Sequence, residues 1–410
     1  MVNNLNDLYT GPITINERIS SLDILRGIAL FGILTINIAS FTPGGPPGFT
    51  HSPNSVDNWI TTFLLLFVES KFFTLFSFLF GLGFSIQLIR AKQRGDGFAL
   101  RFSRRLGALF IFGLLHIVLL WDGDILVVYA IVGFILLLFR NCKEKTLLKW
   151  TGMLLLIPNV IVIIGFSSIE ILRSMSQYAN QFQQFDISFV NAFKNGQQDT
   201  YQILSSGSFA ELISSRVTGY IEVFPLLLSR VPTILAMFLL GFYVGKKDIL
   251  RNISRYQSLL KRLSRWGIGI GLTTNIIIII LTKVLPPIPG VVILLLNQTL
   301  TGPILSLSFS AVIVLGLQNN KVKYLLSPFS NIGRIALTNY ILQSVLYSFI
   351  FYSYGLGLSG EIGTWQALIV AIIFFVLQIC LSNIWLKHFR FGPLEWIWKS
   401  ISYWKMHSIK

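Results

Sequence analysis

The sequence predicts an all-α protein: a polytopic membrane bundle of about ten transmembrane helices, forming a single domain over residues 1–410. Hydrophobic residues make up 53% of the chain and charged residues only 12%, whereas a soluble protein has about 25% charged residues. Ten apolar segments approach the roughly 20 residues that a spanning helix needs. They lie at about 22–41, 72–89, 106–121, 125–139, 147–166, 231–245, 266–282, 291–315, 335–351 and 365–386.

The distribution of charge predicts the orientation of these helices. The net charge is +16. If the N-terminus is cytoplasmic, most of the 33 lysine and arginine residues fall in cytoplasmic connections, most densely at 90–105 and 246–265. This asymmetry follows the positive-inside rule and predicts that both termini are cytoplasmic. It indicates contact with anionic membrane lipids rather than nucleic acid. A cytoplasmic phosphate-bearing ligand is the alternative interpretation.

The first helix begins with two charged residues one turn apart. Residues 1–21 show no cleavable signal, so the first apolar segment is expected to be retained. Asp23 and Arg26 can pair at i and i+3, and an acidic residue suits the first turn. Alternatively, Arg26 faces a cytoplasmic ligand and Asp23 holds it in place. Asn37, near the outer end, either joins helices by a hydrogen bond or polarises a carbonyl group.

Two connections on the outer side are unusual. Segment 42–57 is rich in proline and glycine, which predicts an irregular loop, and it contains His51. The apolar stretch 58–69 is too short to span, so it is expected to be interfacial or re-entrant. The polar insertion at about 167–230 contains a helical pattern over 208–229. It either caps an outer-facing cavity or is a structural lid.

The third apolar segment contains an ionisable residue, His116, and ends at Trp121. An ionisable group inside a membrane helix costs roughly 2.5–3.5 kcal/mol and usually marks function. The following turn places Asp122 and Asp124 at the outer end of an antiparallel hairpin. An imidazole oriented by a carboxylate is a typical general base. The alternative is a packed histidine beside an ordinary turn sequence. The scattered positions of the four histidines predict no metal site.

The ninth apolar segment carries a polar stripe. Asn339 and Gln343 lie at i and i+4 and share one face, and Arg334 opens the helix on the cytoplasmic side. Such stripes line cavities more often than they face lipid. Tyr340 and Ser344 add further polar groups to this segment.

Four motifs in order resemble the YeiB-like family of bacterial membrane proteins. They are residues 18–29 with Asn37, residues 71–76 with 79–81, His116 with 121–126, and residues 333–340 with 343–344. That family is distantly similar to transmembrane acyltransferases, which take an acyl group from cytoplasmic acyl-coenzyme A and deliver it to an outer acceptor. The resemblance therefore implies a multi-pass protein of the bacterial plasma membrane, with acyl-coenzyme A as a co-substrate and no metal.

These observations give two alternative functions, which differ in whether the protein is an enzyme. The first is acyl transfer to an outer acceptor, with His116 as base, or less favourably His51. The second is transport or flipping of a small or amphipathic solute, with the same residues lining its path. Expected partners are membrane lipids, a small-molecule or glycan acceptor, and a second copy in a homodimer.

The acyl-transfer hypothesis assigns residues to three roles. The catalytic group is His116, Asp122, Asp124 and Asn37. The acyl donor is expected to bind Asp23, Arg26, Arg104, Arg105 and Arg334. The residues expected to line the substrate path are Lys71, Asn339, Tyr340, Gln343, Ser344 and His51.

Overall fold

The computed structural model describes residues 19–43, 55–95, 97–285 and 287–410, and this part of the chain is helical without strands. The predicted all-α membrane bundle is confirmed. Eight candidate spans in these ranges are long and apolar enough to cross a membrane, three of them made of consecutive helical elements. Two shorter apolar helices, α6 (Leu126–Leu138) and α14 (Ala336–Phe351), coincide with two further predicted segments.

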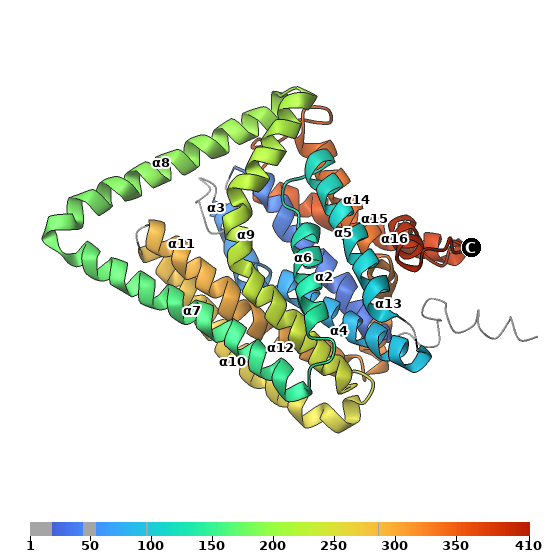
Figure 1. Cartoon of the computed structure of the whole chain (residues 1–410). Helices are drawn as coiled ribbons and strands as arrows, with labels where there is room; N and C mark the ends of the chain where they lie inside the picture. Colours follow the sequence, from blue (N-terminus) through green and yellow to red (C-terminus); the bar gives the residue numbers. More distant parts are fainter. Residues whose placement is uncertain (1–18, 44–54, 96, 286) are drawn as a thin grey trace, which may run out of the picture.

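The helices follow one another with short connections (Figure 1). In chain order, the others are α2 (Ser20–Ile38), the 3₁₀ turn η2 (Ala39–Phe41), α3 (Ser55–Phe67), α4 (Lys71–Arg94), α5 (Phe98–Leu119), α7 (Glu144–Ser174), α8 (Ser176–Ser206), α9 (Phe209–Lys246), α10 (Ile253–Val284), α11 (Pro287–Leu296), the π-helical turn η3 (Asn297–Thr301), α12 (Gly302–Gly316), α13 (Asn320–Arg334), α15 (Thr364–His388) and α16 (Pro393–Tyr403).

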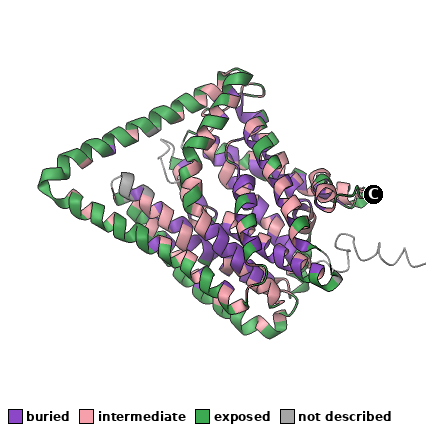
Figure 2. Ribbon diagram, in the orientation of Figure 1, coloured by how far each residue is buried: buried purple, intermediate pink, exposed green. Residues whose placement is uncertain are grey.

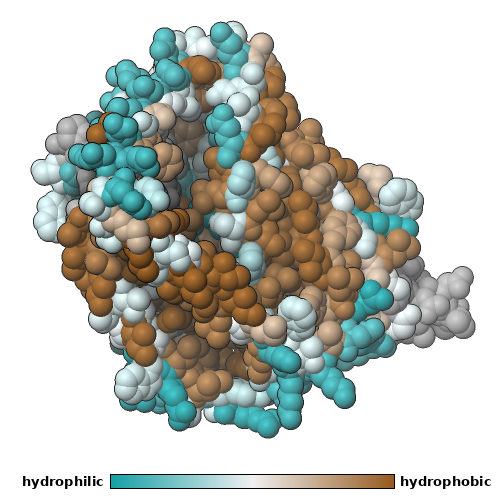
Figure 3. Space-filling view, turned by 60° about the vertical axis from the view of Figure 1, so that its left-hand side comes forward, coloured by the Kyte–Doolittle hydropathy of each residue, from teal (hydrophilic) through white to brown (hydrophobic). Residues whose placement is uncertain are grey.

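The core lies among α2, α4, α5, α6, α9 and α14, where most buried residues gather (Figure 2). By contrast, α7 is apolar but mostly exposed, with few buried residues, which is the pattern of a helix that faces lipid. Hydrophobic side chains cover the middle of the molecule, and hydrophilic ones gather at the top and bottom of the view in Figure 3. This banded surface fits a protein surrounded by lipid at its waist.

Two helix crossings depend on glycine, because backbones touch there. A Cβ on Gly333 of α13 would lie 1.8 Å from the Asp23 carbonyl oxygen of α2, and one on Gly27 would lie 2.1 Å from that of Phe329. Likewise, a Cβ on Gly81 of α4 would lie 1.9 Å from the Phe238 carbonyl oxygen of α9. Small residues allow this close approach in membrane bundles. The α2–α13 crossing fixes Arg26 and Arg334 relative to each other.

Several predicted boundaries were wrong. Helix α5 begins at Phe98 rather than near residue 106, so Arg101, Arg104 and Arg105 lie within its first turns. The insertion 167–230 is helical except at Met175 and at Gly207 and Ser208. It comprises the end of α7, all of α8 and the start of α9, which continues through Pro225 and Pro232 into the next predicted span.

Outside the insertion, helices α13 and α16 were not predicted. Helix α13 is amphipathic rather than apolar and ends at Arg334, before Ile335, whose backbone is not helical. The short stretch 58–69 is helix α3. It is separated from α4 by a turn in which Ser70 has a φ of 68°.

Candidate active site

A cavity of about 270 Å³ lies among α2, α4, α5, α6, α13, α14 and α16. Charged side chains gather where α2, α5 and α14 begin, which we call the basic end. The charged residues that line the cavity are Arg26, Arg101, Arg105, Arg334, Lys399, Asp23 and Glu395. Five cations against two carboxylates give this end a net positive charge, which favours an anionic ligand.

Several of these cations are held by neighbours. The Arg26 Nη1 atom lies 3.2 Å from Asp23 Oδ1, as the i, i+3 spacing predicts. The Arg105 guanidinium stacks 3.5 Å from the ring centre of Trp398. The Trp398 indole in turn donates to the Arg105 carbonyl oxygen at 2.7 Å. These contacts hold α16 against α5, so the C-terminal helix forms one wall of the cavity.

Away from the basic end the cavity is apolar. Its walls carry aromatic and aliphatic side chains, namely Phe73, Phe76, Leu79, Phe80, Phe102 and Leu109. Two tyrosines, Tyr129 and Tyr340, together with Ile125 and Leu126, also line it. Tyr129 donates to the Phe73 carbonyl oxygen at 2.8 Å. The Tyr340 hydroxyl is buried and has no hydrogen-bond partner of good geometry among the described residues. The cavity therefore combines a cationic end with an apolar interior, as an amphipathic anion requires.

His116 lies directly behind Tyr340. The two ring centres are 5.2 Å apart. His116 Nδ1 is 3.0 Å from Asp124 Oδ1, and His116 Nε2 is 2.7 Å from the hydroxyl oxygen of Ser344 on α14. All three side chains are buried. The histidine thus lies between a carboxylate and a hydroxyl, the order in which a carboxylate orients an imidazole to remove a proton from an alcohol.

The local sequence explains why Asp124 reaches the histidine. Asp124 Oδ2 accepts the backbone N–H of Val127 at 2.8 Å, at the start of α6. A carboxylate is favoured at a helix N-terminus, where N–H groups are otherwise unpaired. Gly113 leaves room for this turn, because a Cβ there would lie 2.7 Å from the Val127 nitrogen. Asp122 points elsewhere, toward Gly219 of α9, where a Cβ would lie 2.8 Å from its carboxylate oxygen.

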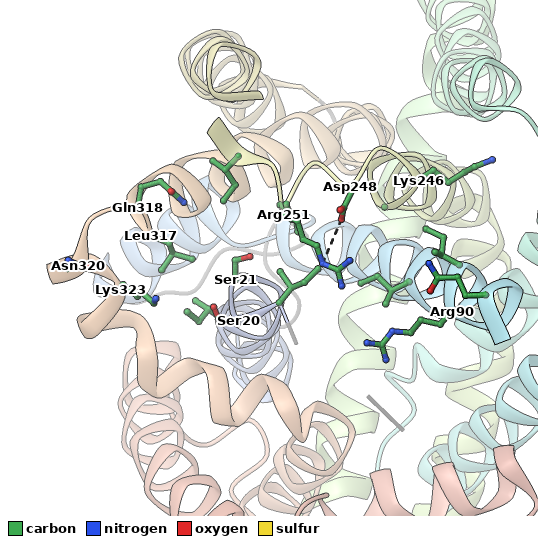
Figure 4. Close-up of a pocket in the computed structure, with 18 residues that line it drawn as sticks. Ser20, Ser21, Arg90, Lys246, Asp248, Arg251, Leu317, Gln318, Asn320 and Lys323 are labelled. Carbon is green, nitrogen blue, oxygen red and sulfur yellow. Dashed lines mark ion pairs between the residues drawn. The ribbon is translucent and has the colours of Figure 1, made fainter. Parts of the chain in front are cut away.

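A second, larger cavity of about 1180 Å³ adjoins the first at the basic end, and Ile19 and Ile86 line both. Figure 4 shows Ser20 and Ser21, at the start of α2, between Lys323 and Arg251. Arg251 lies 3.9 Å from Asp248, the one carboxylate in the lining. We call this space the vestibule. Its cations and the exposed start of a helix suit a phosphate-bearing group.

The chain has relatives along nearly its whole length. It is 34% identical over 411 aligned residues to the uncharacterized protein YxaH of Bacillus subtilis strain 168, covering 96% of both chains. It is 31% identical over 402 residues to the uncharacterized protein YeiB of Escherichia coli K12, covering 94% of this chain and 96% of the relative. The chain belongs to the YeiB-like family. Residues 244–405 also match the family described as protein of unknown function DUF418.

The first cavity is formed by residues from inside and outside the range that matches the family model. The matched range 244–405 of this YeiB-like protein supplies Arg334, Tyr340, Ser344 and Glu395. Helices α2 to α6, which supply His116 and the other arginines that line the first cavity, lie outside that range. Both halves of the chain are therefore needed to form the cavity.

The expected polar stripe of α14 divides into two faces. Asn339 and Gln343 do not line the cavity and instead bind α15. The Asn339 side chain donates to Ser382 at 3.0 Å, and the Gln343 side chain donates to Gln378 at 3.1 Å. Tyr340 lines the cavity, and Ser344, at i+4, contacts His116 behind it. Spacing predicts that Asn339 and Gln343 share a face, but it does not tell which neighbouring helix that face meets.

Other expected site residues lie apart from this group. Arg104 stacks over Trp404 at 5.3 Å and does not line the first cavity. Lys71 is buried at the start of α4, where it donates to the Leu65 carbonyl oxygen at 2.6 Å. Asn37 lies beyond Ile33, the last residue of α2 that lines the cavity. His51 lies outside the described residues.

Sequence reasoning missed several residues of the YeiB-like site. Arg101 lies one helical turn before Arg105 and lines the same cavity, so helical periodicity could have found it. Glu395, Trp398 and Lys399 belong to α16, which hydropathy does not reveal. The pairing of His116 with Ser344 joins helices 228 residues apart, and no local signal predicts it.

Glu395 caps α14 from another helix. Its carboxylate accepts the Leu337 N–H at 2.7 Å, the Thr338 N–H at 3.1 Å and the Thr338 hydroxyl at 2.5 Å. Helix α14 has no side-chain cap of its own. We therefore expect Glu395→Ala to lower the free energy of unfolding by about 1–3 kcal/mol, because buried donors lose their acceptor.

The pH dependence of this cap can be measured as well. Burial raises the pKa of the Glu395 carboxyl above its ordinary value of 4.5. A raised folded-state pKa means that the folded protein binds the proton more tightly than the unfolded one, so this group's stabilising contribution falls as the pH rises above about 4.5. The difference in Tm between Glu395→Gln and the wild type should therefore shift in favour of the variant with rising pH. A difference in Tm between the variant and the wild type that stays constant from pH 4 to pH 8 would contradict this expectation.

Proposed function

We propose that this YeiB-like protein is a membrane acyltransferase that takes its acyl group from acyl-coenzyme A at the basic end. The observation that supports this function best is the first cavity, which has a cationic end, an apolar interior and a wall that adjoins His116. An acyl thioester has matching parts: phosphates, an apolar chain and a carbonyl carbon. The acceptor is a hydroxyl or amine of a small molecule or glycan.

The parts of the donor fit the two cavities. Its phosphates would meet the cations of the basic end, and its nucleotide would occupy the vestibule beside Arg251 and Lys323. The acyl chain would enter the apolar interior, with its carbonyl group near Tyr340. The Tyr340 hydroxyl can donate to the carbonyl oxygen as negative charge develops there, a role first expected of Asn37. His116, oriented by Asp124, acts as the base.

The same proposal assigns an orientation. The basic end faces the cytoplasm of a bacterial cell, in accordance with the positive-inside rule, and the protein resides in the plasma membrane. The His116 end then lies toward the outer side, where an acceptor would arrive. Cysteine accessibility on the vestibule residue Lys323 tests this orientation. Lys323→Cys should react with a membrane-impermeant maleimide only after the cells are opened.

A comparison of adjacent arginines tests donor binding. We expect Arg105→Gln and Arg334→Gln each to weaken binding of octanoyl-coenzyme A about 10-fold, since a charge-assisted hydrogen bond contributes about 1.5–3 kcal/mol. Arg104→Gln is the matched control and should change the Kd less than 2-fold. Binding is measured by calorimetry on protein in lipid nanodiscs. If the wild type neither binds the thioester nor cleaves it, the proposal fails.

A second candidate function, transport of an amphipathic solute, is favoured by a separate group of buried polar residues. Gln298 donates to Glu69 at 3.0 Å, and the Arg230 guanidinium lies 5.6 Å from the ring centre of Phe73, which also lines the first cavity. Ionisable groups at this depth are typical of ion or proton paths. Proton flux in proteoliposomes that is lost in Glu69→Gln, without thioester cleavage, would favour transport.

A further inference from the structure

Three side chains from separate parts of the chain form a line behind the cavity. Asp124 precedes α6, His116 is in the last turn of α5, and Ser344 is near the middle of α14. Asp124 Oδ1 lies 3.0 Å from His116 Nδ1, a close contact without hydrogen-bond geometry, and the His116–Ser344 hydrogen bond is 2.7 Å. His116 uses Nδ1 for the contact with Asp124 and Nε2 for the hydrogen bond with Ser344, so both contacts are made at once.

This order activates an alcohol. A serine hydroxyl is a weak nucleophile until an adjacent base removes its proton. With the proton on Nδ1, the nitrogen nearest Asp124, the lone pair of Nε2 faces the Ser344 hydroxyl, which is the tautomer that a base needs. The carboxylate also favours the imidazolium that forms after proton transfer. Such a group of three is recognised by geometry rather than by sequence order or fold.

Ser344 lies behind the cavity rather than in its lining. It follows the cavity-lining Tyr340 by four residues, one turn along the same face of α14. Ile125, which follows Asp124, also lines the cavity. The Tyr340 hydroxyl is a buried donor with no acceptor of good geometry among the described residues. Ser344 itself is fully buried, so an ester formed there would be shielded from water.

We propose that Ser344 is a nucleophile that carries the acyl group between donor and acceptor; this rests on the proposed function. In the first step Ser344 gives its proton to His116 Nε2, and its Oγ bonds to the thioester carbonyl carbon. The C–S bond breaks, and the leaving thiolate takes the proton from His116. The product is an oxygen ester on Ser344.

The second step reverses the proton path. The acceptor hydroxyl gives its proton to His116, and its oxygen bonds to the ester carbonyl carbon. The bond to Ser344 Oγ breaks, and Ser344 recovers the proton. His116 therefore serves two substrates in turn, and no oxidant or reductant is consumed. Direct transfer without Ser344 would need donor and acceptor to lie beside His116 at the same time.

The test uses the full-length protein in nanodiscs and two probes, octanoyl-coenzyme A and a biotinylated fluorophosphonate. After quenching, mass spectrometry should find an octanoyl group on the peptide that contains Ser344. Ser344→Ala should lose this adduct and lower thioester cleavage at least 100-fold. Ser348→Ala is the matched control, one turn along α14, because its hydroxyl binds the carbonyl oxygens of Leu120 and Ser344. It should retain the adduct.

The outcomes separate this proposal from the function on which it rests. Thioester cleavage that is equally fast in Ser344→Ala, with no adduct, overturns the nucleophile and leaves acyl transfer standing. If octanoyl-coenzyme A is not cleaved at all, the proposed function fails. Fluorophosphonate labelling then decides whether Ser344 is a nucleophile. Labelling of Ser344 that disappears in His116→Ala supports the nucleophile, and the absence of labelling overturns it. If the alanine variant does not fold, Ser344→Cys should instead form a thioester that neutral hydroxylamine cleaves.

Discussion

Replacing His116 by alanine should lower the rate of thioester cleavage at least 100-fold while leaving the Kd for octanoyl-coenzyme A within about 2-fold. Proton transfer by a positioned base contributes about 10²–10⁴-fold, and His116 does not line the cavity in which the donor would bind. The measurement is single-turnover cleavage in nanodiscs, alongside binding to the same samples. His388→Ala, at the exposed C-terminal end of α15, is a control that should keep the wild-type rate.

The two aspartates of the turn allow a sharper comparison. Asp124→Asn keeps the size of the side chain but removes the carboxylate that lies 3.0 Å from His116 Nδ1. The rate should fall nearly as far as in His116→Ala, because the histidine loses the partner that orients it. Asp122→Asn, whose side chain lies toward α9, should change the rate less than about 10-fold. Equal effects of the two substitutions would contradict the assignment of Asp124.

A second large effect is expected on stability, at the crossing of α4 and α9. Gly81→Ala would place a Cβ 1.9 Å from the Phe238 carbonyl oxygen, and the nearest atoms are backbone. The helices must separate, which should cost about 3 kcal/mol, the upper part of the usual range for overpacking. We expect a lower thermal midpoint and loss of monodisperse protein in size-exclusion chromatography after detergent extraction.

Gly107→Ala is the matched control for this substitution. Gly107 lies within α5, and a Cβ there would meet no atom within 4 Å. Alanine favours a helix over glycine by about 1 kcal/mol, so this variant should be as stable as the wild type or slightly more stable. If Gly81→Ala behaved like Gly107→Ala, the close crossing of α4 and α9 would be wrong.

Hydropathy was sufficient to predict the helical membrane bundle, because spanning helices must be long and apolar whatever they contact. It could not predict α13 and α16, which are amphipathic and lie beside the bundle at its basic end. It also placed the limits of α5 and α9 wrongly. Helices continue beyond the apolar segment when polar residues at their ends meet solvent or other helices.

The candidate site was predictable only where its parts are close in sequence. Asp124 follows His116 by eight residues, across one turn, so their contact could be anticipated. The side of α14 that contacts His116 could not be anticipated, because Asn339 and Tyr340 are neighbours in sequence but face different helices. Their roles depend on how α14 is rotated within the bundle, and that rotation is set by packing over the whole molecule.

The participation of α16 in the cavity has a consequence for biosynthesis. The first described helix, α2, and the last, α16, both line the same cavity, and Arg105 stacks on Trp398 across this junction. A ribosome makes these elements some 370 residues apart. The cavity is therefore complete only once α16 has been made. A chain truncated before α16 could insert most of its helices into the membrane and still lack one wall of this cavity.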